Sequence, residues 1–125
     1  MFFQLNPHNG VPLFEQIVRQ VKFAIASKQL LPGDRVPSVR DLATQIAVNP
    51  NTVAKAYRDL TTEGVLNTLR GEGLEVTLTA PAYCKTERQR LIQERLTHVL
   101  EEALQSGLTA RDIKQLVNQQ LTDSS

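Results

Sequence analysis

Two helix starts lie within residues 38–57, which read Ser38-Val-Arg-Asp-Leu-Ala-Thr-Gln-Ile-Ala-Val-Asn-Pro-Asn-Thr-Val-Ala-Lys-Ala-Tyr57. Ser38 and Asp41 have the spacing of a capping box, and the apolar residues after them predict a short helix. Asn49 and Pro50 mark the second start, because asparagine caps free N–H groups and proline suits the first helical position. Gly64 is placed to end this second helix. The stretch therefore encodes two helices joined by a tight turn.

The segments on either side complete a small domain. Apolar residues recur at spacings of three and four between residues 12 and 28 and predict an amphipathic helix there. Residues 65–78 change to a period of two and contain the glycine-rich turn Gly71-Glu-Gly73, which predicts a β-hairpin. Helices followed by such a hairpin are the element order of a winged helix-turn-helix. We therefore expect a winged helix-turn-helix domain over residues 1–79, in a protein of mainly α class with a small β-hairpin wing.

The C-terminal part, residues 80–125, is expected to be a two-helix dimerisation segment. Pro81 closes the preceding unit, and a long helix is predicted over about residues 86–106. Thr109 and Asp112 have capping spacing and predict a last helix. Two helices of this size bury little surface alone, so their apolar faces need the winged domain or a second subunit. The stripe expected to form the dimer interface consists of Ile92, Leu96, Val99, Leu100, Ala103 and Leu104.

The composition is that of a folded protein, which we expect to be cytoplasmic. The 125 residues are 41% hydrophobic and 22% charged, whereas a disordered chain has low hydrophobicity and high net charge. The sequence has no apolar run long enough for a membrane span and no secretory leader, and its single cysteine, Cys84, fits a reducing compartment. The formal net charge of +1 gives no reason to invoke nucleic acid, so any binding face must come from local placement.

The sequence contains no catalytic or metal-binding pattern. His8 and His98 are far apart and have no acid or cysteine at metal-ligand spacing, and Cys84 has no nearby histidine. The pair Gly71 and Gly73 is too short for a dinucleotide or phosphate-loop motif. We therefore expect no enzyme activity, no cofactor and no metal.

The polar face of the helix that starts at Pro50 suits base reading. At about 100° per residue, Asn51, Lys55 and Arg58 point away from the apolar side, and Thr52 lies on the shoulder. Asparagine can bind adenine through two hydrogen bonds, and lysine can reach guanine or phosphate. Taken alone, such a face is also what ordinary solvation of an amphipathic helix produces.

Two arginines lie where further DNA contacts are made in proteins of this type. Arg40, in the first turn of the preceding helix, could pair with a phosphate or reach the groove edge. Arg70 and Gly71, at the hairpin turn, suit a minor groove, where negative potential attracts arginine. The alternatives are a surface arginine paired with a local acid and a tight turn with no further role.

The chain resembles the GntR family of bacterial transcription regulators, and within it the short YtrA-like branch. The resemblance covers most of residues 10–78 and is carried by Gly10-Val-Pro-Leu-Phe-Glu-Gln-Ile17, Leu31-Pro-Gly-Asp-Arg-Val-Pro-Ser-Val-Arg-Asp-Leu-Ala43, Val48-Asn-Pro-Asn-Thr-Val-Ala-Lys-Ala-Tyr57 and Glu63-Gly-Val65. It implies a repressor that binds a palindromic operator in double-stranded DNA as a homodimer, with a short C-terminal segment for dimerisation. Larger relatives carry a ligand-binding domain for which this chain has no room.

The resemblance also implies roles for individual residues. Arg40 corresponds to an arginine that contacts DNA. The recognition-helix tip holds Asn49, Asn51, Thr52 and Lys55, and the wing tip holds Arg70 and Gly71. With Ser38 and Arg58, these are the candidate DNA-binding residues.

The wing departs from the family pattern. Its usual sequence, Gly-[Lys/Arg]-Gly-Thr-[Phe/Tyr]-Val, is here Gly71-Glu-Gly-Leu-Glu-Val76, with the acid Glu72 in place of a cation. Between Ser38 and Gly73 the basic and acidic residues balance to a net charge of zero. Because non-specific binding comes from phosphate neutralisation, we predict weak non-specific affinity and a modest dependence on salt. The alternative function is a winged-helix adaptor that meets an acidic protein partner through the same face. The operator and any small-molecule effector are left open.

Overall fold

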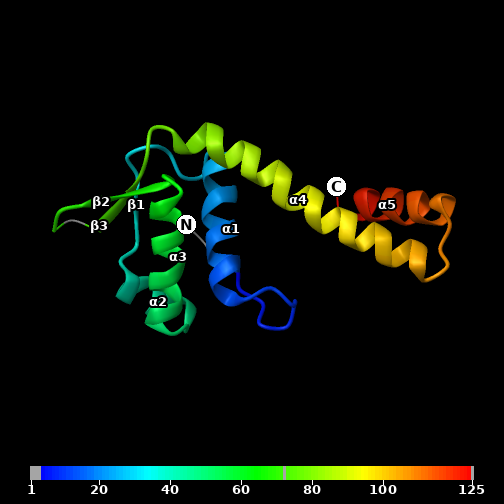
Figure 1. Cartoon of the computed structure of the whole chain (residues 1–125), viewed down its shortest axis with the longest axis horizontal. Helices are drawn as coiled ribbons and strands as arrows, with labels where there is room; N and C mark the ends of the chain where they lie inside the picture. The colour runs from blue at the N-terminus through cyan, green and yellow to red at the C-terminus, as the bar shows by residue number, and fades with distance from the viewer. Residues whose placement is uncertain (1–3, 72, 125) are drawn as a thin grey trace. The chain divides into compact units, whose positions relative to one another are not determined.

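The computed structural model describes residues 4–71 and 73–124 (Figure 1), so Glu72 lies outside the described residues. In this part of the chain five helices and three short strands follow one another. They are α1 (Leu13–Ala26), β1 (Arg35–Val36), α2 (Val39–Ile46), α3 (Pro50–Thr62), β2 (Leu66–Leu69), β3 (Gly73–Val76), α4 (Ala80–Gln105) and α5 (Ala110–Ser124). The predicted class, mainly helical with a small β-hairpin, is confirmed.

The chain divides into two compact units, residues 1–88 and residues 89–125. The expected start of the long helix near residue 86 was wrong, because α4 begins at Ala80. Pro81 does not close the preceding unit but lies in the first turn of α4, where its missing N–H has no helical partner to lose. Ala80 and Cys84, one turn apart, are fully buried in the core of the first unit. The domain boundary expected after residue 79 stays a prediction.

The wing is a three-stranded antiparallel sheet with the order β1-β3-β2. In the predicted hairpin, Leu66 lies opposite Val76 and Leu69 lies opposite Gly73. The sequence did not predict β1, because two residues are too few to show a period of two. β1 pairs with β3 through Arg35 and Glu75 and thereby ties the wing to the chain before α2.

Local capping fixes both helices of the helix-turn-helix. The Asp41 backbone N–H donates to Ser38 Oγ at 3.0 Å, at the start of α2. The Asn51 backbone N–H donates to Asn49 Oδ1 at 2.8 Å, at the start of α3. Between the helices, Ala47 adopts the left-handed conformation with a φ of 53°, and its N–H bonds the Ala43 carbonyl. Both predicted helix starts are confirmed.

The core of the first unit holds the three N-terminal helices against the sheet. Tyr57 of α3 is buried, and its hydroxyl donates to the Pro37 carbonyl at 2.7 Å, which ties α3 to the loop before α2. Burial raises the pKa of this hydroxyl well above its usual value. The largest fully buried side chains are Ile17, Val21, Ile25, Leu42, Val53, Leu60, Val65, Leu66, Val76 and Cys84.

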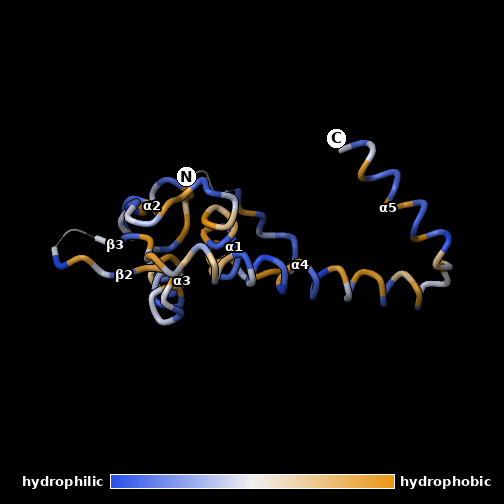
Figure 2. Tube along the Cα trace, turned by 90° about the horizontal axis from the view of Figure 1, so that it is seen from above, coloured by the Kyte–Doolittle hydropathy of each residue, from blue (hydrophilic) through white to orange (hydrophobic). Residues whose placement is uncertain are grey.

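The second unit consists of the C-terminal part of α4 together with α5. Its turn carries the predicted capping pair, in which Asp112 N–H donates to Thr109 Oγ1 at 3.1 Å and Thr109 N–H donates to Asp112 Oδ2 at 3.0 Å. The backbone and side-chain hydrogen bonds of Thr109 lower the pKa of the Asp112 carboxyl. Hydrophobic segments recur along both helices, as Figure 2 shows.

Candidate nucleic-acid interface

The outer ridge of α3 has the orientation predicted from helical periodicity. Asn51, Lys55 and Arg58 are exposed, whereas Val53 and Leu60 on the opposite side are completely buried. Thr52 is half-buried on the shoulder of the helix. The ridge therefore presents an amide, an ammonium and a guanidinium to the outside of the first unit.

Two of the candidate residues also have a structural task at the helix starts. Ser38 and Asn49 are exposed, but their side-chain oxygens accept the capping hydrogen bonds of α2 and α3. Helix starts of this kind favour anions, because free N–H groups and the helix dipole both attract negative charge.

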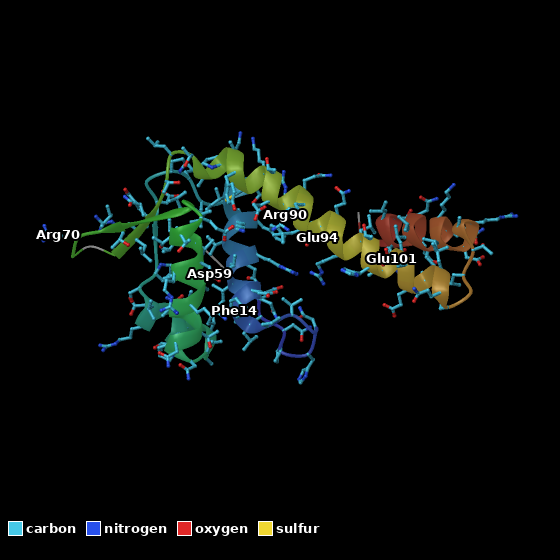
Figure 3. All side chains as sticks on the ribbon, viewed as in Figure 1. Phe14, Asp59, Arg70, Arg90, Glu94 and Glu101 are labelled. Atoms are coloured by element: carbon cyan, nitrogen blue, oxygen red, sulfur yellow. The ribbon has the colours of Figure 1, made fainter. Side chains whose placement is uncertain are left out.

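The other two candidate arginines lie outside α3, one on α2 and one on the wing. Arg40 is exposed in the first turn of α2. Arg70 lies at the tip of the β2–β3 hairpin (Figure 3), next to Gly71, whose φ of 74° a residue with a side chain would rarely adopt. Glu72, the acid in place of the family's usual cation at this turn, lies outside the described residues.

The ammonium of Lys55 has a partner that the sequence did not predict. Its Nζ lies 3.7 Å from the centroid of the Phe14 ring, on the first turn of α1. This distance is within the range of a cation–π interaction. Phe14 itself is half-buried and packs against the core of the first unit. A core side chain of α1 thus contacts a charged side chain of the predicted recognition helix.

A buried ionic cluster at the other end of α3 was also missed by the sequence reasoning. Lys22 of α1 is 3% exposed, and its Nζ lies 2.9 Å from Glu63 Oε1 and 2.6 Å from Glu87 Oε1. The Tyr83 hydroxyl donates to Glu63 Oε1. The one local signal is that Lys22 stands four residues after Val18 and so continues an apolar face. The cluster joins α1, the end of α3 and the start of α4.

Cys84 lies beside this cluster and is completely buried. Burial raises the pKa of its thiol to about 11, and the nearby Lys22 ammonium opposes the rise only in part. A thiol that stays protonated at neutral pH is a poor nucleophile. The structure therefore gives Cys84 the character of a core residue.

The predicted interface stripe is apolar and solvent-exposed. Ile92, Leu96, Val99 and Leu104 are about half exposed, and Leu100 and Ala103 are partly covered. A groove of about 510 Å³ lies between α4 and α5 and is lined mainly by Leu96, Leu100, Leu104, Ile113 and Val117. The interface predicted from the sequence lies on α4 alone, but Leu116, Val117 and Leu121 of α5 are exposed as well.

Two kinds of feature are absent from the described residues. Over residues 4–71 and 73–124, no three His, Cys, Asp or Glu side chains gather closely enough to hold a metal ion. Within the same ranges, none of the helices combines the length and the apolar character that crossing a membrane requires.

Comparisons with known proteins give the chain a family context. The model of the bacterial regulatory proteins of the gntR family matches residues 13–76. The HTH-type transcriptional repressor YtrA of Bacillus subtilis is 35% identical over 116 residues, which are 93% of this chain and 89% of YtrA. A transcriptional regulator from Oenococcus oeni, solved by crystallography, is 35% identical with a TM-score of 0.66, over 96% of this chain and 99% of that one. The DNA-binding domain of AraR, crystallised with operator ORE1, is 26% identical with a TM-score of 0.52, over 62% of this chain and 94% of that one.

Proposed function

The chain belongs to the GntR family of bacterial regulatory proteins, and we propose that it is a repressor that binds a palindromic operator as a homodimer. As in its relatives, the activity is DNA-binding transcriptional regulation and not catalysis. The observation that carries the proposal is the exposed polar ridge of α3, held on its apolar side by the core of the first unit. A similar domain, that of AraR, has been crystallised on its operator.

We assign base reading to the start of α3. In helix-turn-helix proteins the N-terminal residues of the recognition helix meet base edges in the major groove. Asn51 is exposed there, and its amide can give and accept one hydrogen bond each with adenine. Thr52 on the shoulder and Arg58 further along the ridge are the further groove contacts, and Arg40 and Arg70 contact the flanking backbone or minor groove.

The balance of charge on this face favours specific over non-specific binding. Residues 38–73 carry no net charge, so this face neutralises few DNA phosphates. Non-specific affinity, which comes from counterion release, should therefore be weak and only modestly dependent on salt. Specific binding then depends on base contacts, on the helix starts and on the doubling of contacts in a dimer.

The second unit is the proposed dimerisation surface. Its exposed apolar side chains lie on both α4 and α5, which is more apolar surface than an isolated pair of helices keeps in water. A second copy of the same unit would cover it, because a two-fold interface uses the same patch on both subunits. The two-fold axis of such a dimer would match the symmetry of a palindromic operator.

The DNA-binding part of the proposal is tested by fluorescence anisotropy. The full-length protein is titrated onto the DNA upstream of its own gene and onto a scrambled duplex, across a salt series. We expect tight binding to the native fragment alone, and we expect Asn51→Ala to weaken it by about tenfold or more, the cost of one bidentate base contact. Gln93→Ala, an exposed amide in the second unit, is the matched control and should bind like the wild type.

Equal and weak binding to both duplexes would contradict the proposal. If the protein binds no DNA and variants of the same ridge lose binding to a protein partner, the adaptor function would be favoured.

The dimer is tested by sedimentation with Leu96→Asp. Leu96 is half exposed and lines the apolar groove between α4 and α5, so a charge there should yield monomers and weaken operator binding. Thr97→Asp places the same charge on the next, exposed residue and should leave the dimer intact. A Leu96→Asp variant that is still a dimer would refute this interface.

A further inference from the structure

The contact between Lys55 and Phe14 joins the predicted recognition helix to α1. Lys55 lies in the second turn of α3, and Phe14 lies in the first turn of α1. The ammonium stands 3.7 Å from the centre of the ring, against an outer limit of about 6 Å for a cation–π interaction. Figure 3 shows Phe14 near the beginning of α1 and Asp59 on α3. Among the residues that the structure describes, Lys55 forms no ion pair, although Asp59 follows it by one helical turn.

The position of the ring decides where the positive charge lies. A free lysine side chain on the outer ridge would extend beside Asn51 and Arg58. Here its end lies against the Phe14 ring of α1, at the side of the ridge that faces α1. The ammonium has three N–H donors, and Lys55 is still exposed, so the side turned away from the ring is open to an anion.

We infer that Phe14 is a positioning residue for DNA binding, which holds the Lys55 ammonium at the flank of the recognition helix as a phosphate contact and not as a base reader. The inference rests on the proposed function and specifies one part of it. An ammonium held in one place can contact a phosphate in only one position of the recognition helix along the groove. A mobile ammonium could make that contact in many positions of the helix. On a face with no net charge, this contact contributes to orientation as well as to affinity.

The contact itself can be tested without DNA. An ammonium-bearing side chain over an aromatic ring shows its ε-methylene protons shifted upfield in the NMR spectrum. We expect this shift for Lys55 in the wild type, its loss in Phe14→Leu, which keeps an apolar side chain, and its retention in Phe14→Tyr, which keeps a ring. A Lys55 resonance that does not change in Phe14→Leu would overturn the inference. Thermal unfolding followed by circular dichroism checks that each variant is folded.

The role in DNA binding is tested by a double-mutant cycle on the operator. We expect Lys55→Ala to weaken binding by the same factor for every base-substituted operator, and to reduce the salt slope by about 0.9 per subunit, the value for one phosphate contact. Phe14→Leu should weaken binding about two- to fivefold when Lys55 is present and have no effect beside Lys55→Ala. Phe14→Tyr, which keeps a ring, should bind the operator with the affinity and the salt slope of the wild type.

The outcomes separate this inference from the proposed function. An equal loss from Phe14→Leu in both backgrounds would show that the ring acts only through the stability of the fold and would overturn the positioning role. A change of base preference at one operator position in Lys55→Ala would make Lys55 a base reader and overturn it as well. Failure of the wild type to distinguish native from scrambled DNA would refute the proposed function and, with it, this role, while the ring contact would still be visible by NMR.

Discussion

Replacement of Lys22 by methionine is expected to destabilise the first unit strongly. The ammonium is buried and stands between two carboxylates, at 2.9 Å from Glu63 and 2.6 Å from Glu87. Methionine has a similar length and no charge, so Lys22→Met leaves both acids without this cation. Removing one partner of a buried ion pair costs about 3–5 kcal/mol.

The exposures of the two acids place the expected loss within this range. The Glu87 side chain is 9% exposed and cannot become well hydrated, whereas that of Glu63 is 31% exposed and can recover water. We therefore expect a loss of about 3 kcal/mol in the free energy of unfolding, at the lower end of this range, because only the Glu87 carboxylate stays buried after the ammonium is removed. Against a total of about 5–15 kcal/mol for an ordinary domain, this is a large fraction.

The assay is urea unfolding followed by tyrosine fluorescence. The chain contains no tryptophan, and its two tyrosines, Tyr57 and Tyr83, both lie in the first unit, so the signal reports that unit alone. Glu87→Gln keeps Lys22 paired with Glu63 and should cost about 1.5–3 kcal/mol, the value of a hydrogen bond to a charged group. The double variant Lys22→Met with Glu87→Gln should be more stable than Lys22→Met alone, because it removes one of the two carboxylate charges that contact Lys22 in the wild type.

The matched control is the Glu15–Arg19 pair, which lies in the same unit at a distance of 3.9 Å and whose acid side chain is 45% exposed. Glu15→Gln should change the free energy of unfolding by less than about 1 kcal/mol, as exposed ion pairs do. A loss below about 1 kcal/mol for Lys22→Met, or one no larger than for Glu15→Gln, would refute the expectation that burial makes the ion pairs of Lys22 important for stability.

Three further predictions concern single groups. Tyr57→Phe removes the hydrogen bond to the Pro37 carbonyl and should lower the free energy of unfolding by about 1–2 kcal/mol in the same urea assay; an unchanged midpoint would mean that water replaces the hydroxyl. Cys84 should resist thiol reagents at pH 7–8 until the first unit unfolds, and rapid labelling of the native protein at neutral pH would contradict this expectation. Because folding raises the pKa of the thiol from about 9 to about 11, the protonated thiol contributes its full stabilisation below about pH 9, and this contribution is lost as the pH rises to about 11. Thr109→Ala removes one of the hydrogen bonds that lower the pKa of Asp112, so an NMR titration should show that pKa moving back up toward its usual value, and no movement would show that the Thr109 hydroxyl is not a cause.

The helix starts and the orientation of α3 could be predicted because their causes are local. A capping pair such as Ser38 and Asp41 is separated by three residues, and the outward direction of Asn51 follows from the helical period alone. The start of α4, in contrast, was wrongly predicted near residue 86, whereas the helix begins at Ala80. Pro81 is compatible with both the end of one unit and the first turn of a helix, and the burial of Ala80 by the core decides between them.

The candidate site shows the same division. The sequence pointed to Lys55 as a charged residue on the outer ridge, and this orientation holds. It gave no indication that Phe14 of another helix would hold the charge, because a phenylalanine on an apolar stripe predicts only burial. Similarly, β1 becomes a strand only through its pairing with Glu75 and Leu74 of β3.

By itself, then, the sequence determined the order of the helices and the hairpin, their caps, their apolar and polar sides and the resemblance to a family of regulators. These properties depend on residues within about four positions of one another, or on motifs that are read directly. Only the tertiary structure decided that Lys22 meets Glu63 and Glu87, 41 and 65 residues further along the chain, and that Lys55 meets Phe14. Such pairs form when separate helices pack and exclude water between them, and a linear pattern carries no record of which side chains will then face each other.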